Sequence, residues 1–367
     1  MKKHSHTKNC IRVILLCPLS LLFLYLASVT PSFSEWYATN IYPVISKSIN
    51  SLSAKVSFSV AEIVIIVFFS LLLIYLIYTV VKLISAEKRG QRLLNFVLNI
   101  ASISSLICFV FVFLCGVNYH RYTFTEVSGL EVHDSSTNEL YDLCADLTER
   151  VNLLRTELTE NSDGVAFTDK TYEQLAVECQ TAYDKLESQY STLIAGYSVT
   201  KPVYFSSLMS YSGITGVFFP FTYEANVNVD VPLYTVPSTM CHELTHLRGY
   251  MREDEANYIA YLACKESEDS FVRYSGYMLA LVHSMNRLYG DDTELYHDLY
   301  NKLSDDVKAD LRFNSSYWAS HEGVINEISD KVNDAYLKVN NQDDGVKSYG
   351  RMVDLLLAEF RKVVSAE

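Results

Sequence analysis

The stretch that decides the fold is CHELTHLRGYMREDEANYIAYLAC, residues 241–264. Its first six residues contain the pattern His-Glu-x-x-His. On a helix, His242 and His246 lie one turn apart on the same face, so they can present two imidazole nitrogens to one ion. The pattern therefore predicts a helix that carries two ligands of a zinc ion. A catalytic zinc site takes a third ligand from the protein, which must come from elsewhere.

The boundaries of this helix can be predicted from its flanks. It is expected over 238–248, with Ser238 or Thr239 as the capping residue. Gly249 comes three residues after His246, and a glycine at that place ends a helix and lets the chain turn sharply. A second helix is expected over 252–266.

The third ligand is expected at the start of that second helix. Metzincins place a third histidine three residues after the glycine, but Arg252 occupies this position, and an arginine cannot ligate a metal. Glu253, Asp254 and Glu255 remain. Glu253 shares a helix face with Asn257, whose amide can steady a ligand histidine. We therefore expect Glu253 as the ligand, with Glu255 as the alternative.

The same motif supplies a candidate catalytic base. Glu243 follows His242 directly and can take a proton from a water molecule that zinc activates. The reaction also needs a hydrogen-bond donor near the substrate carbonyl. Tyr336 is our candidate for this role, although each candidate side chain in the C-terminal helices is more often structural. The other candidates are Tyr349, Arg351 and His321.

Three apolar runs fill the N-terminal third of the chain, at about 10–29, 56–85 and 94–119. Each reaches the roughly 20 residues that a helix needs to cross a bilayer. The first run could instead be a cleaved signal peptide. We expect three transmembrane helices in a membrane domain of residues 1–119, followed by a second domain, 120–367.

The charges indicate the orientation in the membrane. Residues 1–119 carry ten Lys or Arg and three Asp or Glu, whereas the rest of the chain carries 20 Lys or Arg and 40 Asp or Glu. Basic residues concentrate before the first run and in the short loop 86–93. The positive-inside rule places both in the cytoplasm, so the acidic domain is expected outside the cell membrane. Its acidity argues against nucleic-acid binding.

The outer domain is predicted to be mainly α, with one small β-sheet just before the metal motif. Residues 201–237 alternate valines and aromatics between glycines and prolines, which favours two or three short strands. Helical spacing covers most of the remainder. The other predicted helices are 139–158, 169–194, 270–289, 293–311, 314–339 and 344–365. Four cysteines of this domain, Cys144, Cys179, Cys241 and Cys264, could form disulfides, but no pairing follows from the sequence.

Two resemblances follow from these motifs. The pattern Glu-x-x-Ala-Asn after His-Glu-x-x-His resembles the gluzincins, among them membrane CAAX-processing and heat-shock peptidases, and implies Glu253 as ligand and Asn257 as its outer support. The spacing of six residues between His246 and Glu253 is shorter than in most of those families, and Gly249 can supply the tight reversal. NYHRYTFTEVSGL (118–130), SLMSYSGITGVFFPFTYEANVNV (207–229) and DAYLKVNNQDDGVKSYGRMVDLL (334–356) complete a pattern similar to the bacterial membrane family called domain of unknown function 3810. That resemblance implies three spans and a zincin-like domain with a metal site.

These expectations combine into a membrane-anchored zinc metallopeptidase that cleaves an extracytoplasmic peptide or protein. A zinc ion is the expected cofactor, and a peptide and the lipid bilayer are the expected partners. The alternative is a metal-stabilised binding or sensor domain that cleaves nothing and signals through the spans. A transporter is disfavoured, because Glu62 is the only acid within a predicted span and lies near its end.

Overall fold

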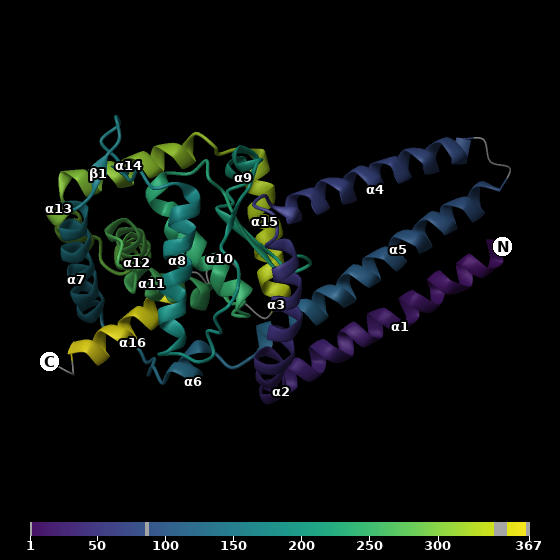
Figure 1. The fold of residues 1–367 in the computed structure, drawn as a ribbon, viewed down its shortest axis with the longest axis horizontal. Coiled ribbons are helices and arrows are strands. Elements are labelled where there is room, and N and C mark those ends of the chain that lie inside the picture. Colours follow the sequence, from purple (N-terminus) through teal and green to yellow (C-terminus); the bar gives the residue numbers. More distant parts are fainter. Residues whose placement is uncertain (1, 85–87, 341–350, 365–367) are drawn as a thin grey trace.

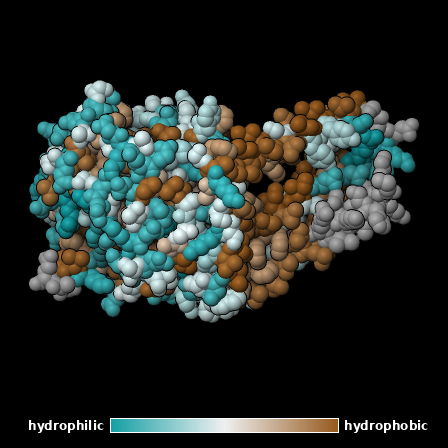
Figure 2. All heavy atoms as spheres, in the orientation of Figure 1, coloured by the Kyte–Doolittle hydropathy of each residue, from teal (hydrophilic) through white to brown (hydrophobic). Residues whose placement is uncertain are grey.

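The computed structural model describes residues 2–84, 88–340 and 351–364, and it is mainly helical. Three long helices, α1 (Lys2–Val29), α4 (Val60–Ile84) and α5 (Arg89–Leu114), extend away from a helical domain (Figure 1). Apolar side chains cover the part of these helices next to the domain, whereas hydrophilic side chains gather toward their far ends (Figure 2). The domain with the predicted metal motif is thus set at one end of a bundle of apolar helices.

The long helices agree with the predicted membrane spans in part. α4 and α5 are each long and apolar enough to cross a membrane. The first predicted span belongs to a pair of helices, Val13–Val29 and Pro31–Ser53, and the chain bends by 106° between them. The part of the chain that the structure describes therefore has two candidate membrane-spanning helices, or three if this bent pair counts as one span.

The segment between the first two runs is helical and packs against the domain. It forms α2 (Pro31–Trp36), the π-helix η1 (Tyr37–Ile41) and α3 (Tyr42–Ser53). The Tyr42 hydroxyl donates to the carbonyl of Leu247 at 3.1 Å, at the end of the metal-motif helix. The Asn50 amide donates to the carbonyl of Tyr223 at 2.8 Å. A segment that lies within the predicted membrane domain therefore supports the second domain directly.

The helices of the second domain follow the apolar spacing of the sequence. The predicted apolar face of α7, including Leu140, Leu147 and Val151, is buried in the core. The helices here are the short η2 (Gly116–His120), α6 (Phe124–Ser128), α7 (Thr137–Arg155), α8 (Tyr172–Glu187), α9 (Ser206–Tyr211), η3 (Leu233–Thr235), α10 (Val236–Leu247), α11 (Glu253–Lys265), α12 (Ser270–Asp291), α13 (Thr293–Lys302), α14 (Asp305–Ala319), α15 (Val324–Val339) and α16 (Met352–Val364).

Two predicted helices are each divided in the structure, and the predicted helix over 169–194 ends earlier, at Glu187 of α8. The pattern over 293–311 is divided between α13 and α14, because the Ser304 hydroxyl accepts from the Val307 N–H and starts a new helix there. Apolar spacing does not show this break, since the buried Leu299, Leu303 and Val307 keep a four-residue interval across it. The pattern over 314–339 is likewise divided between α14 and α15. Part of the last predicted helix, 344–350, lies outside the described residues.

Within the described residues, the strands form two small sheets rather than the one that the sequence predicted. The missed sheet is a hairpin of β1 (Thr159–Glu160) and β2 (Ala166–Phe167), whose strands of two residues are too short to show an alternating pattern. The predicted region holds β3 (Lys201–Pro202), β4 (Gly216–Phe219) and β5 (Glu224–Val227). Their order is β3-β5-β4, with β3 parallel and β4 antiparallel to β5. β4 is therefore an edge strand.

The four cysteines of this domain are buried and unpaired. The Cys179 thiol lies within hydrogen-bonding range of the Cys241 thiol, which in turn contacts that of Cys264. Cys179 of α8, Cys241 of α10 and Cys264 of α11 thus lie together as packing residues between these helices.

Candidate metal centre

The metal-motif helix α10 begins two residues earlier than the sequence predicted. Pro237 lies in its first turn, where a missing N–H costs nothing, and Thr235 is the N-cap without a side-chain hydrogen bond. The predicted capping by Ser238 or Thr239 is wrong, since both hydroxyls lie inside the helix and donate to the carbonyl of Thr235. At the other end Gly249 has a φ of 89°, which permits the predicted sharp turn.

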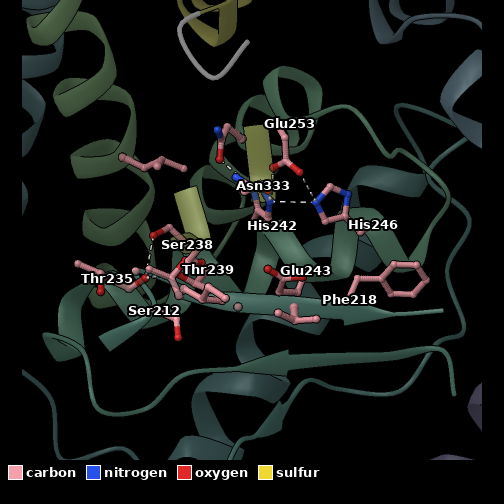
Figure 3. A pocket seen from close by; sticks show the side chains of 18 of the residues that line it. Ser212, Phe218, Thr235, Ser238, Thr239, His242, Glu243, His246, Glu253 and Asn333 are labelled. Carbon is pink, nitrogen blue, oxygen red and sulfur yellow. Dashed lines mark hydrogen bonds and ion pairs between the residues drawn. The ribbon is translucent and has the colours of Figure 1, made fainter. Parts of the chain in front are cut away.

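This turn brings Glu253, the first residue of α11, back over the two histidines (Figure 3). The Nε2 atoms of His242 and His246 lie 3.0 Å apart. Oε2 of Glu253 lies 3.1 Å from Nε2 of His242, and Oε1 lies 3.6 Å from Nε2 of His246. One ligand atom from each residue falls within 4.8 Å of the others, so the three could hold one metal ion.

The Nδ1 atom of each histidine, on the side of the ring away from the cluster, makes a hydrogen bond that holds the ring in place. Nδ1 of His242 lies 2.8 Å from Oδ1 of Asn257, and Nδ1 of His246 lies 2.8 Å from the carbonyl oxygen of Tyr250. Both partners are acceptors, so each Nδ1 carries a proton and each Nε2 faces the cluster. Asn257 takes the supporting position that was predicted for it.

The electrostatics of the cluster suit a cation. Burial would raise the pKa of Glu253, but the adjacent His246 and His242 outweigh burial and hold that pKa below its usual range. The side chains of the three residues are 10–15% exposed, so a small opening remains toward solvent. Two imidazoles and one carboxylate form a donor set that binds zinc and leaves one coordination position free. The residues present therefore fit a zinc ion.

Glu243 lies beneath this cluster and against β4. Its side chain is buried, and its Oε2 has no hydrogen-bond partner among the described residues. Burial raises the pKa of Glu243, and the charges of His242 and His246 oppose that shift. Gly216 of β4 makes room for the carboxylate, because a Cβ at this position would lie 2.8 Å from the Glu243 Cδ.

A cavity of about 690 Å³ opens over the cluster. β4 lines one side through Gly216, Val217 and Phe218, and α15 lines another through residues that include Ser329 and Asn333. Figure 3 shows Asn333 and the metal-site residues around this space. An extended peptide would fit alongside β4, whose outer edge has no strand partner within the described ranges.

Tyr336 lines the cavity and is paired with a residue that the sequence analysis did not single out. Its hydroxyl lies 2.7 Å from that of Tyr119, which also lines the cavity. Burial raises the pKa of Tyr336, so the phenol stays protonated and can donate a hydrogen bond. Tyr119 belongs to η2, directly after the apolar helix α5, and no spacing relates it to the metal motif.

The remaining candidates lie away from the cluster. Glu255, the alternative ligand, accepts a hydrogen bond from the Phe124 N–H at 2.8 Å and is not in the cluster. Arg351 forms an ion pair with Asp254 at 3.2 Å. His321 stacks with Tyr317 and does not line the cavity. Tyr349 lies outside the described residues.

The cavity also contains a third histidine that was not predicted. His283 of α12 lines it, and burial lowers the pKa of His283 to about 4, with the charge of His242 acting in the same direction. Its imidazole is therefore neutral at ordinary pH and can donate through an N–H. A single histidine in the middle of a helix has no motif spacing by which it could be identified.

Comparison with known proteins places the chain in a family without a known activity. No curated protein and no solved structure matches it. A family model described as "Protein of unknown function (DUF3810)" matches residues 37–357, which include η1 through the first six residues of α16. Because this match covers most of the sequence, the chain belongs to the DUF3810 family.

Proposed function

We propose that the protein is a membrane-anchored zinc-dependent metallopeptidase with a zincin-like domain. The observation that carries this proposal is the convergence of His242, His246 and Glu253 beside a buried carboxylate, Glu243, that has a free oxygen. A structural zinc site needs no such base, and its four ligands usually close it. An open ligand set next to a base in a peptide-sized cavity is typical of hydrolysis.

His242, His246 and Glu253 would hold the ion, and a bound zinc would supply Lewis acidity that polarises a peptide carbonyl and lowers the pKa of a water molecule. Glu243 would remove a proton from a water molecule in the cavity as the water oxygen attacks the carbonyl carbon of the peptide. The same carboxyl group then delivers the proton to the leaving nitrogen as the C–N bond breaks. The products are a free acid and a free amine.

Other residues of the cavity have positioning roles in this proposal. The β4 edge would hold the substrate backbone by strand pairing. Tyr336 would donate a hydrogen bond to the carbonyl oxygen as negative charge develops there. The charge distribution of the chain supports an extracytoplasmic location for the site, with the N-terminus and the loop 86–93 in the cytoplasm.

The test uses the full-length protein, because α3 supports the domain. Zinc content is measured by mass spectrometry of the metal, and cleavage is measured on a mixture of unstructured peptides. We expect Glu253→Ala to lose zinc. Glu243→Gln should keep zinc and lose cleavage by a factor of about 10² or more. Glu322→Gln, at an exposed position, is the matched control.

Each result separates the alternatives. Full zinc occupancy in Glu253→Ala would contradict the ligand set, and undiminished cleavage in Glu243→Gln would contradict the role of the base. Zinc binding by the unaltered protein without cleavage of any peptide would favour a metal-stabilised sensor domain instead.

A further inference from the structure

Helix α15 turns a polar face toward the domain and an apolar face outward, which is the reverse of an ordinary surface helix. Its polar residues Ser329, Asp330 and Asn333 line the metal-site cavity. Its apolar residues are exposed: Val324 is 71% exposed, and Ile328 and Val332 are 56% and 65% exposed. Val332 lies at the border of the two faces, since it also lines the cavity. These positions follow one another at four-residue steps, so they form a continuous apolar stripe along the helix. A helix in water would place such a stripe inward.

The position of α15 explains what could cover this stripe. The helix lies on the side of the domain that faces the apolar helices and runs across their ends (Figure 1). Near its C-terminal end, the ring of Tyr336 packs edge-on against Phe111 in the last turn of α5, with centroids 6.3 Å apart. The apolar stripe is therefore continuous with the end of a candidate membrane span.

A second exposed apolar patch is attached to the other candidate span. It consists of Tyr204, Phe205, Leu208 and Tyr211, of which Tyr204 is 85% exposed. The carboxylate of Glu62, at the start of α4, accepts hydrogen bonds from the backbone N–H groups of Tyr204 and Phe205 at 3.0 and 2.8 Å. Tyrosines at the end of a span are typical of the layer where lipid headgroups meet acyl chains.

Among possible occupants, a bilayer fits both patches together. An amphipathic helix that lies flat buries its apolar face about 5–10 Å into the headgroup boundary. Since α4 and α5 would cross the same bilayer, the stripe on α15 and the patch 204–211 would reach that boundary without any movement. A second protein would have to cover two separate patches that both border the spans.

We propose that the apolar stripe of α15 and the patch 204–211 lie in the interfacial layer of the bilayer that α4 and α5 cross. The polar face of α15 then forms a wall between the membrane surface and the metal-site cavity. Resting on the proposed peptidase function, we infer that the substrate is a polypeptide held at the membrane surface, such as a lipid-anchored chain or the flank of a transmembrane segment.

The location of α15 can be tested without any activity. Nitroxide labels are placed singly at 328 and 332 of the full-length protein in phosphatidylcholine–phosphatidylglycerol vesicles, after Cys10, Cys17 and Cys108 are changed to serine. Collision rates with oxygen and with a water-soluble nickel chelate are then measured. Leu71→Cys in α4 gives the lipid reference, and Leu153→Cys, on an exposed site of α7, gives the water reference.

We expect the labels at 328 and 332 to collide more often with oxygen than with the chelate. The ratio of the two collision rates should lie between the ratios at the two reference positions, and nearer to that at Leu71. A ratio equal to that at Leu153 would overturn the proposal. Protection from both reagents that disappears when the protein is diluted in lipid would also overturn it, because a second copy would then cover the stripe.

The substrate class has its own test. A fluorogenic peptide that the protein cleaves is supplied free or with a palmitoyl chain that holds it on the same vesicles. We expect the anchored peptide to be cleaved at least tenfold faster at equal bulk concentration, and the double variant Val324→Asp/Ile328→Asp, at two exposed positions outside the cavity lining, to lose that preference while cleaving the free peptide as before. Equal rates for both peptides would overturn the substrate inference. Absence of all cleavage would contradict the peptidase proposal but leave the labelling result intact.

Discussion

Asn257 holds the ring of His242 in place, with 2.8 Å between Oδ1 of the amide and Nδ1 of the imidazole. The contact fixes the ring so that Nε2 faces the cluster. Removal of such an outer hydrogen bond usually weakens metal affinity by a factor of about 10–100. We expect this loss in Asn257→Ala, measured by competition with a chromogenic zinc chelator. Asn257→Asp keeps an oxygen acceptor and should bind zinc much as the unaltered protein does. Equal affinity of Asn257→Ala would show that the amide does not steady the ligand.

Gly216 controls the position of the proposed base. A Cβ at this residue would lie 2.7 Å from the Glu243 Cγ, so the Gly216→Ala side chain would push the carboxylate out of place. We expect peptide cleavage to fall by about 10² while zinc content stays unchanged, because a small displacement of a catalytic group is costly. Gly290→Ala is the matched control, since a Cβ there meets no atom within 4 Å. Loss of zinc in Gly216→Ala would instead indicate that β4 supports the whole site.

Tyr336 and Tyr119 form a hydrogen-bonded pair, so variants of each can show which phenol contacts the substrate and which only supports the other. One hydroxyl of the pair must donate to the other, which leaves one proton free to point into the cavity. If Tyr336 donates to the substrate, Tyr336→Phe should lower kcat by about 10²–10³ with little change in KM. Tyr119→Phe should cause a smaller loss, because it removes only the partner of that donor. Steady-state kinetics of the two variants measure which loss of kcat is larger. The reverse ranking would transfer the role to Tyr119.

The geometry of the cluster could be predicted from local rules. The four-residue interval of His242 and His246 and the shared face of Glu253 and Asn257 depend only on helix periodicity. Gly249 has the positive φ that the sharp turn requires. These features belong to 24 consecutive residues, so no long-range information was needed to place them beside one another.

What could not be predicted depends on packing between distant segments. Tyr119, His283 and Asn333 reach the cavity from three helices, and each is a single residue without a motif. The sequence predicted only a helix over 314–339, and apolar spacing alone does not show whether the apolar stripe of α15 faces the core or a membrane. The break at Ser304 was missed because apolar spacing continues through it, although the serine itself is a common cap.

A buried ion pair gives a prediction for stability. Asp310 accepts hydrogen bonds from Arg155 at 2.9 Å and from the Ala166 N–H at 2.8 Å, and it links α14 to α7 and β2. Asp310→Ala would leave the Arg155 guanidinium, which is 2% exposed, without its buried counter-charge. We expect a loss of about 3–5 kcal/mol and a Tm lower by roughly 6–20 °C.

Thermal unfolding of the detergent-solubilised protein measures this effect. Asp298→Ala removes a comparable but exposed ion pair with Lys302 and should cost no more than about 1 kcal/mol. Equal Tm values for the two variants would mean that solvent reaches the Asp310 network.

The charge asymmetry gives a final prediction about orientation. Lys88, Arg89 and Arg92 flank the turn between α4 and α5, while the region beyond α5 carries a large excess of acids. Basic residues near span ends stay in the cytoplasm, so the turn and the metal site should lie on opposite sides of the membrane. A membrane-impermeant maleimide, added to intact cells, should label Asp163→Cys and leave Gly90→Cys unlabelled until the cells are opened. Both positions are exposed, so neither label depends on unfolding. Labelling of Gly90→Cys with protection of Asp163→Cys would place the metal site in the cytoplasm and exclude extracytoplasmic substrates.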